Sequence, residues 1–213
     1  MVITDIGHMA VHVEGHDYVF RPTFQAMTRI GSPEQIITTM AAVFGSRYPQ
    51  HDIYNPDLAR AAVSRGYAEI MAASSAILRA CCDDNVDLLL GKMKITTRGR
   101  LFRRGGIMPF DSIHIIAQHL LLHGIVGDQP AEQVESKGEF NSRFEARSWV
   151  YQAMAHLGLS ESDAWSMTMT GLRAAIAAKY PQKEKNKIPS EEEYDEFMEM
   201  ADALAEADYS AVH

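Results

Sequence analysis

The 213-residue sequence has few of the motifs that mark an enzyme. It contains no GxSxG, CxxC or HExxH motif, and no glycine-rich loop of the GxxxxGK[ST] or GxGxxG spacing. A nucleophile elbow, a zinc-protease helix and a nucleotide-binding loop are therefore not indicated. We expect a protein that is not an enzyme and that uses no cofactor.

Long apolar runs are also absent. The most apolar segment, IIAQHLLLHGIVG, is interrupted by Gln118, His119 and His123, so a membrane-spanning helix is not expected. The first residues lack a positive start followed by an apolar centre, and no secretory signal is expected. The only cysteines, Cys81 and Cys82, are adjacent, and a bridge between neighbours in a helix would be strained. This predicts free thiols and a cytoplasmic location.

A basic excess is missing, and the acidic excess is uneven. The net charge is −8, but residues 181–213 alone hold three lysines and ten acidic residues. Residues 1–180 hold 17 basic and 18 acidic residues, a net charge of −1. An acidic tail indicates a solubilising role or a basic protein partner, and no general nucleic-acid surface.

The patterns that are present predict a mainly α fold. Met9, Val11 and Val13 alternate before a turn at residues 14–17, which predicts a small N-terminal β-hairpin. Proline and cap signals begin helices at Pro22, at Ser32 and at Asn55. We expect a hairpin over 1–21 packed on the main domain, a helical domain over 22–180, a linker over 181–190 and an acidic helix over 191–208.

Residues 140–180 contain both tryptophans and several helix caps. Gly158 is expected to end a helix that contains Trp149, and Ser160 with Asp163 forms a capping box for a short helix around Trp165. A further helix over 172–179 would follow a cap at Thr168 or Thr170. Periodicity alone places Trp165 in the core. Arg173 and Lys179 are the only cations between residues 157 and 180, too few for a DNA-recognition helix.

Residues 92–106 hold six basic residues and no acidic residue. Glycine at 99, 105 and 106 favours a loop, which is either solvated, or paired with the protein's own acids, or in contact with phosphates with Phe102 available for stacking. The helix predicted after Pro109 should stop at Gly124 and carries His114, His119 and His123. A glutamate is missing between the last two, so a metal site is not expected there.

His8 and His12 share the face of the hairpin opposite Met9, and they would bind metal only with a third ligand from elsewhere. A solvated strand face is the preferred interpretation. In the tail, Ser190 and Glu193 predict a helix with one apolar stripe, which either docks on the protein's own core or binds a partner. The residues of this stripe that are predicted to bind a partner, together with Trp165, are Tyr194, Phe197, Met198, Ala201 and Leu204.

The segment LGLSESDAWSMTMTGLRAAI, within residues 157–176, resembles the tail assembly chaperones of tailed bacteriophages. Their helical domain often carries Gly-Leu-Ser, acidic residues, an aromatic residue that is usually Trp, then Met or Leu, Thr and a leucine-bearing helix. The run FRPTFQAMTRIGSPEQI, residues 20–36, is more weakly similar to the opening helix of these proteins. The matching residues of the main segment are Gly158, Leu159, Ser160, Asp163, Trp165, Met167, Thr168 and Leu172.

This resemblance implies a non-enzymatic helical protein of the bacterial host cytoplasm. It would bind the phage tape measure protein or tail tube protein before assembly, with self-association as a further possibility. The alternatives are a structural head-tail connector or tail protein, and a metal-binding or nucleic-acid-binding protein built on the histidines and the basic segment. The resemblance favours the chaperone. The interrupted apolar runs and the lack of a basic excess indicate no membrane partner and no nucleic-acid partner.

Overall fold

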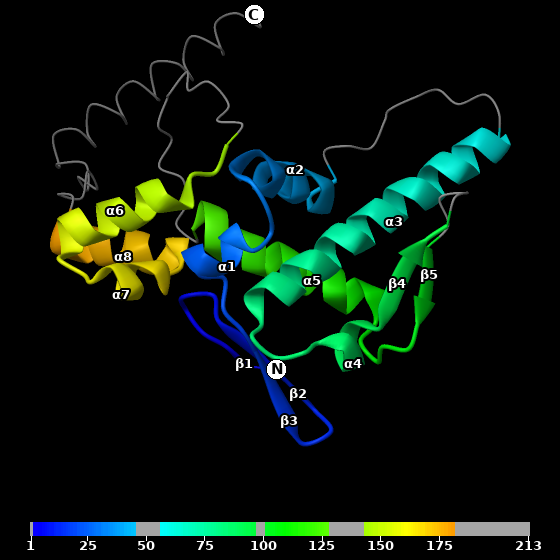
Figure 1. Ribbon diagram of the computed structural model, residues 1–213, viewed down its shortest axis with the longest axis horizontal. Helices are drawn as coiled ribbons and strands as arrows, with labels where there is room; N and C mark the ends of the chain where they lie inside the picture. The colour runs from blue at the N-terminus through cyan, green and yellow to red at the C-terminus, as the bar shows by residue number, and fades with distance from the viewer. Residues whose placement is uncertain (1, 46–55, 97–100, 128–142, 182–213) are drawn as a thin grey trace, which may run out of the picture. The chain divides into compact units, whose positions relative to one another are not determined.

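Helices account for most of the residues that the structure describes, which confirms the mainly α class (Figure 1). The computed structural model describes residues 2–45, 56–96, 101–127 and 143–181. Residues 1–179 form one compact unit, and residues 180–213 form a second. The predicted linker and the predicted acidic helix of the tail lie outside the described residues.

The first unit contains eight α-helices within the described ranges, with one π-helical turn, η1, directly after α5. The helices are α1 (Phe24–Thr28), α2 (Pro33–Val43), α3 (Pro56–Cys81), α4 (Asp87–Leu90), α5 (Phe110–Leu121), η1 (Leu122–Val126), α6 (Ala146–Leu157), α7 (Glu161–Trp165) and α8 (Met169–Lys179). Helix α4 was not predicted.

The N-terminal hairpin is present and belongs to a three-stranded antiparallel sheet. Its strands are β1 (Val2–Ile3), β2 (Met9–Val13) and β3 (His16–Phe20), in the spatial order β1-β2-β3. The turn at Glu14 and Gly15 has positive φ at both residues, as a two-residue hairpin of the I′ type requires. Met9 is buried on the inner face and His12 is exposed on the other, as predicted. His8, which was also expected on the solvated face, is partly buried instead.

The core lies between α3 and α5, which pack side by side at the centre of the first unit, with α2 against both (Figure 1). Helices α6, α7 and α8 form a second group that packs on α1 and η1. Strand β3 enters the core, because Phe20 is fully buried and bridges Cys82 at the end of α3. Large side chains that are fully buried include Phe24, Met27, Ile77, Leu78, Ile113, Leu120 and Leu121.

The caps predicted at Ser32, Gly158 and Ser160 form as expected, whereas those predicted at Asn55 and Ser190 lie outside the described residues. Ser32 Oγ accepts from the backbone N–H of Gln35, and the Gln35 side chain accepts from the Ser32 backbone N–H at 2.8 Å. Thr23 caps α1, so the helix predicted from Pro22 begins two residues later, at Phe24. Gly158 ends α6 in the left-handed conformation with φ of 71°.

The stop predicted at Gly124 was wrong. The helical segment continues from α5 through η1, and it ends at Gly127, whose φ is +84°. Gly124 serves a close contact instead, since a Cβ there would lie 2.8 Å from Met27 Sδ and 3.2 Å from Pro22 Cβ. Gly124 is therefore needed for close packing against Met27 and Pro22, and it does not end the helix.

The loop predicted over residues 92–106 was also wrong. Strands β4 (Lys92–Ile95) and β5 (Leu101–Arg104) pair antiparallel in a second sheet. The hairpin is held to the core by Arg103, whose guanidinium donates to the backbone carbonyls of Leu90, Met108 and Leu89 at 2.7–2.9 Å. The same guanidinium lies 4.9 Å from the centre of the Phe110 ring.

Across the described residues, every helix is too short or too polar to cross a lipid bilayer.

Candidate protein-binding site

The corner between α6 and α8 is built by three local caps. Gly158 turns the chain, Ser160 Oγ accepts from the Asp163 backbone N–H at 3.2 Å, and Asp163 in turn accepts from the Ser160 hydroxyl at 2.7 Å. Thr168 then caps α8, because its Oγ1 accepts from the Gly171 backbone N–H at 3.0 Å. These short-range bonds place Trp165 at the end of a single helical turn.

Two long-range hydrogen bonds fix this corner to the rest of the unit. The Phe24 backbone N–H at the start of α1 donates to the Met167 carbonyl at 2.9 Å. The Thr168 hydroxyl donates to the Ile6 carbonyl at 2.9 Å, in the turn between β1 and β2. The corner is therefore held from two sides, which keeps α7 in a defined position against α1.

Trp165 is half-buried and lines a surface hollow. Its ring packs on the edge of the core, while the indole N–H donates to Glu161 Oε1 at 3.3 Å. The hollow has a volume of about 440 Å³ and is lined by Gln25, Thr28, Ser162, Trp165 and Ser166. An indole with a polar rim is typical of a contact residue in a protein interface. The expectation that periodicity places Trp165 in the core is met only in part.

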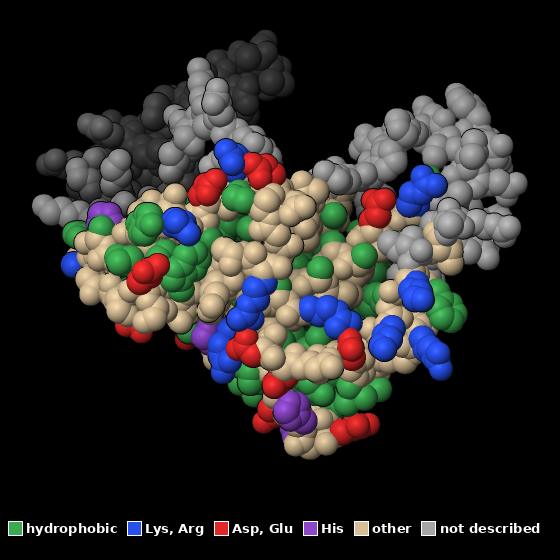
Figure 2. Space-filling model, in the orientation of Figure 1, with side chains coloured by type: hydrophobic (Ala, Val, Ile, Leu, Met, Phe, Trp, Pro, Cys, Tyr) green, Lys and Arg blue, Asp and Glu red, His purple; other side chains and the backbone are tan. Residues whose placement is uncertain are grey.

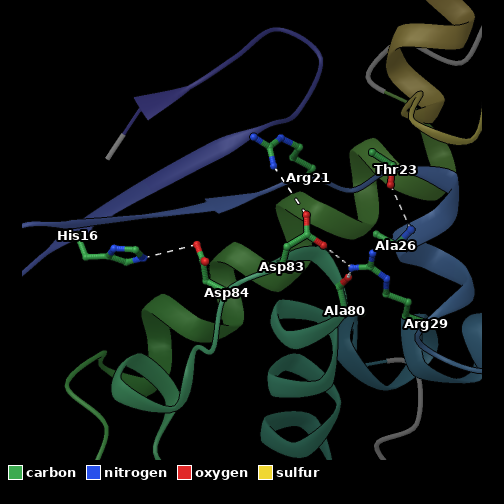
Figure 3. Close-up of polar contacts among 8 residues, drawn as sticks. All are labelled: His16, Arg21, Thr23, Ala26, Arg29, Ala80, Asp83 and Asp84. Carbon is green, nitrogen blue, oxygen red and sulfur yellow. Dashed lines mark hydrogen bonds and ion pairs between the residues drawn. The ribbon is translucent and has the colours of Figure 1, made fainter. Parts of the chain in front are cut away.

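A second, more polar pocket adjoins this hollow and shares Gln25 and Ser166 with it. Its volume is about 420 Å³, and Figure 3 shows Arg21 and Arg29 directed at Asp83 from two sides. Arg29 Nη1 lies 2.8 Å from Asp83 Oδ1, and Arg21 Nη1 lies 3.9 Å from Asp83 Oδ2. Arg29 also donates to the Ala80 carbonyl in the last turn of α3. One carboxylate thus faces two guanidinium groups.

Neighbouring contacts extend this polar network along β3. The Arg21 backbone N–H donates to the Cys81 carbonyl at 2.8 Å, which ties the end of β3 to the end of α3. His16 Nε2 lies 3.5 Å from Asp84 Oδ2 across the same junction (Figure 3). Both acids follow α3 directly, so the polar pocket is a junction between the sheet and the longest helix.

Burial makes the two cysteines at and beside this pocket poor nucleophiles. Burial raises the pKa of the Cys81 thiol, and burial likewise raises the pKa of Cys82. Both cysteines are free and buried, as predicted for free thiols. Burial, and then the positive charge of Arg21, lowers the pKa of His8 and keeps its ring neutral at pH 7. The pocket therefore offers fixed charge and hydrogen bonds for binding.

The histidines considered as metal ligands lie in different parts of the structure and contact different side chains. His12 Nδ1 lies 2.6 Å from Asp17 Oδ1 across the exposed hairpin, and His114 lies 3.3 Å from Ser74 Oγ. The rings of His119 and His123 lie close together, and His123 Nδ1 contacts Thr170 Oγ1 at 2.8 Å inside the core. Among the described residues, no group of three or more His, Cys, Asp or Glu side chains has the spacing of a metal site.

Of the residues predicted to bind a partner, only Trp165 falls within the described part of the chain. The five tail residues of the predicted stripe, residues 194–204, lie outside it. The structure adds Gln25, Thr28 and the Arg21–Asp83–Arg29 cluster, which sequence reasoning did not single out. The one available signal was the similarity of residues 20–36 to a family segment, because Arg21, Gln25, Thr28 and Arg29 all lie in that run.

Comparison with known proteins identifies a family. The model of a family of unknown function, DUF6246, matches residues 20–196, most of the chain. The matched residues include both α1 and the Trp165 corner, which together line the hollow. Searches of curated proteins and of solved structures found no match.

Proposed function

We propose that this chain, which belongs to the DUF6246 family of unknown function, is a bacteriophage tail assembly chaperone that binds the tape measure protein or the tail tube protein before assembly. The observation that carries the proposal is the position of Trp165. Trp165 is one of the residues that match the chaperone motif, and it stands half-buried at a surface hollow, where a partner could reach its ring.

The surroundings of Trp165 suit recognition of a partner's apolar side chain. Tryptophan buries a large area with little loss of side-chain freedom, and it is enriched among the residues that dominate binding energy. Gln25, Thr28 and the two serines of the hollow supply hydrogen-bonding groups around the ring. An inserted apolar side chain would cover the indole, while this rim pairs with the partner's backbone.

The adjoining charged cluster would add selectivity. Arg21 and Arg29 share the single carboxylate of Asp83, so a partner that brings its own carboxylate has a guanidinium available to it. Such exposed pairs contribute little to fold stability and more to the choice of partner. In this role the protein acts by binding alone, in the cytoplasm of the bacterial host, and keeps an aggregation-prone partner covered.

Replacing Trp165 with Ala tests the proposal directly. The tagged chain is co-expressed with the tape measure protein, and separately with the tail tube protein, of the same phage genome. We expect the Trp165→Ala variant to capture at least about tenfold less partner, because a central interface tryptophan contributes about 2 kcal/mol or more. Its free energy of unfolding should fall by less than the 3–5 kcal/mol typical of a fully buried tryptophan.

Tyr151→Ala is the matched control, because Tyr151 is an aromatic residue of α6 that is 54% exposed and does not line the hollow. It should capture both partners as the wild type does. A folded Trp165→Ala variant with undiminished capture would contradict the proposed binding site. Failure of the wild-type chain to capture either partner, or its recovery as a stoichiometric component of purified particles, would contradict the chaperone function itself.

A further inference from the structure

The hairpin of β4 and β5 presents a basic face with an aromatic residue among the cations. The strand register pairs Lys92 with Arg104 and Lys94 with Phe102. Directly paired residues of antiparallel strands point to the same side, as do residues two apart along one strand. These four residues therefore share one face, and the opposite face carries Met93 and Arg103.

Exposure agrees with this assignment. Lys92, Lys94 and Arg104 are exposed, and Phe102 is 60% exposed, whereas Met93 and Arg103 are half-buried against the core. Figure 2 shows Lys and Arg side chains gathered over β4 and β5 beside an exposed hydrophobic group. Arg103 holds three backbone carbonyls on the other face, so the outward cations form a set distinct from the residue that anchors the hairpin.

The positive charge of this face is not neutralised by acidic side chains, and it lowers the stability of the hairpin. Within the described ranges, none of its three cations forms an ion pair, although Arg79 and Asp87 close by pair at 2.6 Å. Like charges directly opposite each other, as Lys92 and Arg104 are, destabilise a strand pair. An exposed phenyl ring between such cations adds no core packing. A polyanion with flat rings is the ligand class that satisfies both features.

We propose that this face, formed by Lys92, Lys94, Phe102 and Arg104, binds single-stranded nucleic acid. Phosphates would lie along the three cations, and one base would stack on Phe102. Stacking on an aromatic side chain combined with cations along the backbone is the usual way in which single strands are bound without sequence preference. Neither strand lines the Trp165 hollow, so this property is separate from the proposed chaperone site.

The face also selects against two other polyanions. A duplex keeps its bases stacked and would leave Phe102 without a partner, so it should bind more weakly than a single strand. An acidic protein segment offers carboxylates but no flat rings, and would gain nothing from Phe102. The net acidic charge of the chain does not oppose the inference, because the cations are concentrated on one hairpin.

The test measures fluorescence anisotropy of a labelled oligothymidylate of about 16 nucleotides with the full chain. We expect saturable binding at low salt, with a slope of log K against log salt of about −2 for three phosphate contacts. Lys94→Glu should weaken binding at least about fivefold. Arg147→Glu, the same charge change at an exposed position of α6, should have much less effect. An equal loss in both variants, or no binding by the wild type, would overturn the proposal.

Substitutions at two further positions, Phe102 and Lys92, separate binding from folding. Phe102→Leu keeps an apolar side chain without an aromatic face and should weaken binding by about fivefold or more, whereas Phe102→Tyr should restore it. Lys92→Glu places a carboxylate opposite Arg104, and should raise the thermal midpoint while it weakens binding. Unchanged binding in Phe102→Leu would remove the stacking role. Equal competition by a polyglutamate peptide would assign the face to acidic protein segments and contradict nucleic-acid binding.

Discussion

Arg103 satisfies three backbone carbonyl groups with one side chain. Its guanidinium donates to the carbonyls of Leu89, Leu90 and Met108, which lie around the short helix α4 and the chain that leads into α5. Loss of a partner to buried polar groups costs more than the bond itself contributes, because the carbonyls remain away from water. The residue is therefore a structural anchor within a basic segment.

We expect Arg103→Met to lower the free energy of unfolding by about 2–4 kcal/mol, measured by urea denaturation. Arg104→Met is the matched control on the exposed side of the same strand, and should change it by about 0.5 kcal/mol or less. Similar losses for both variants would show that the three carbonyl contacts contribute little.

His8 gives the fold a dependence on pH. Because burial and the nearby charge of Arg21 lower its pKa in the folded chain, the unfolded chain takes up the proton first as the pH falls. The contribution of His8 to stability is thus complete above the unfolded pKa of about 6.5 and is lost progressively below it.

We expect His8→Gln to lose less stability between pH 7 and pH 5 than the wild type does. Chemical denaturation at the two pH values measures this difference, and comparing each chain with itself removes the direct effect of the substitution. The same loss in both chains would mean that His8 is solvated enough to titrate normally in the folded state.

At the scale of the elements, two glycines flank the second hairpin, with Gly91 between α4 and β4 and Gly105 directly after β5. Gly91 and Gly105 both have φ of +71°, a conformation that other residues adopt at a cost. They differ in available space. A Cβ on Gly91 would lie 2.4 Å from the Gly105 carbonyl oxygen, whereas a Cβ on Gly105 would meet nothing within 4 Å.

Gly105→Ala should therefore cost about 1–2 kcal/mol of unfolding free energy, from backbone strain alone. Gly91→Ala carries the same strain, and crowding against the backbone should add about 1–3 kcal/mol. Thermal unfolding of the two variants side by side measures the difference. Equal midpoints would contradict the close approach of residues 91 and 105.

The sequence predicts those features that depend on residues close together in the chain. The caps at Ser32, Gly158 and Ser160 depend on groups within about three or four residues, and each was predicted. The β4–β5 hairpin was missed because the glycines and the many charges of this segment favoured a loop. The short polar–apolar alternation Lys92-Met93-Lys94-Ile95, which indicates a strand, was not recognised. The contacts by which Arg103 anchors this hairpin depend on carbonyl groups that the tertiary structure brings together, so no local sequence pattern predicts them.

At the scale of the whole first unit, the class of fold was predictable and the candidate site was not. Apolar residues recur at helical spacing along α3 and α5, and the buried ones among them include Ile77, Leu78 and Leu120. The Trp165 hollow joins α7 to Gln25 and Thr28 of α1, residues more than a hundred positions apart. Sequence reasoning could select Trp165 from a motif, but only the folded chain supplies the other wall.

The contact between Ile6 and Thr168 also sets an order on folding during synthesis. The turn before β2 receives its hydrogen bond from a residue 162 positions later, and Gly7 in the same turn packs on His123. The N-terminal hairpin therefore lacks its contacts with His123 and Thr168 until most of the first unit has been translated. For a protein proposed to shield others, this interval on the ribosome is the period in which its own N-terminal strands most need protection.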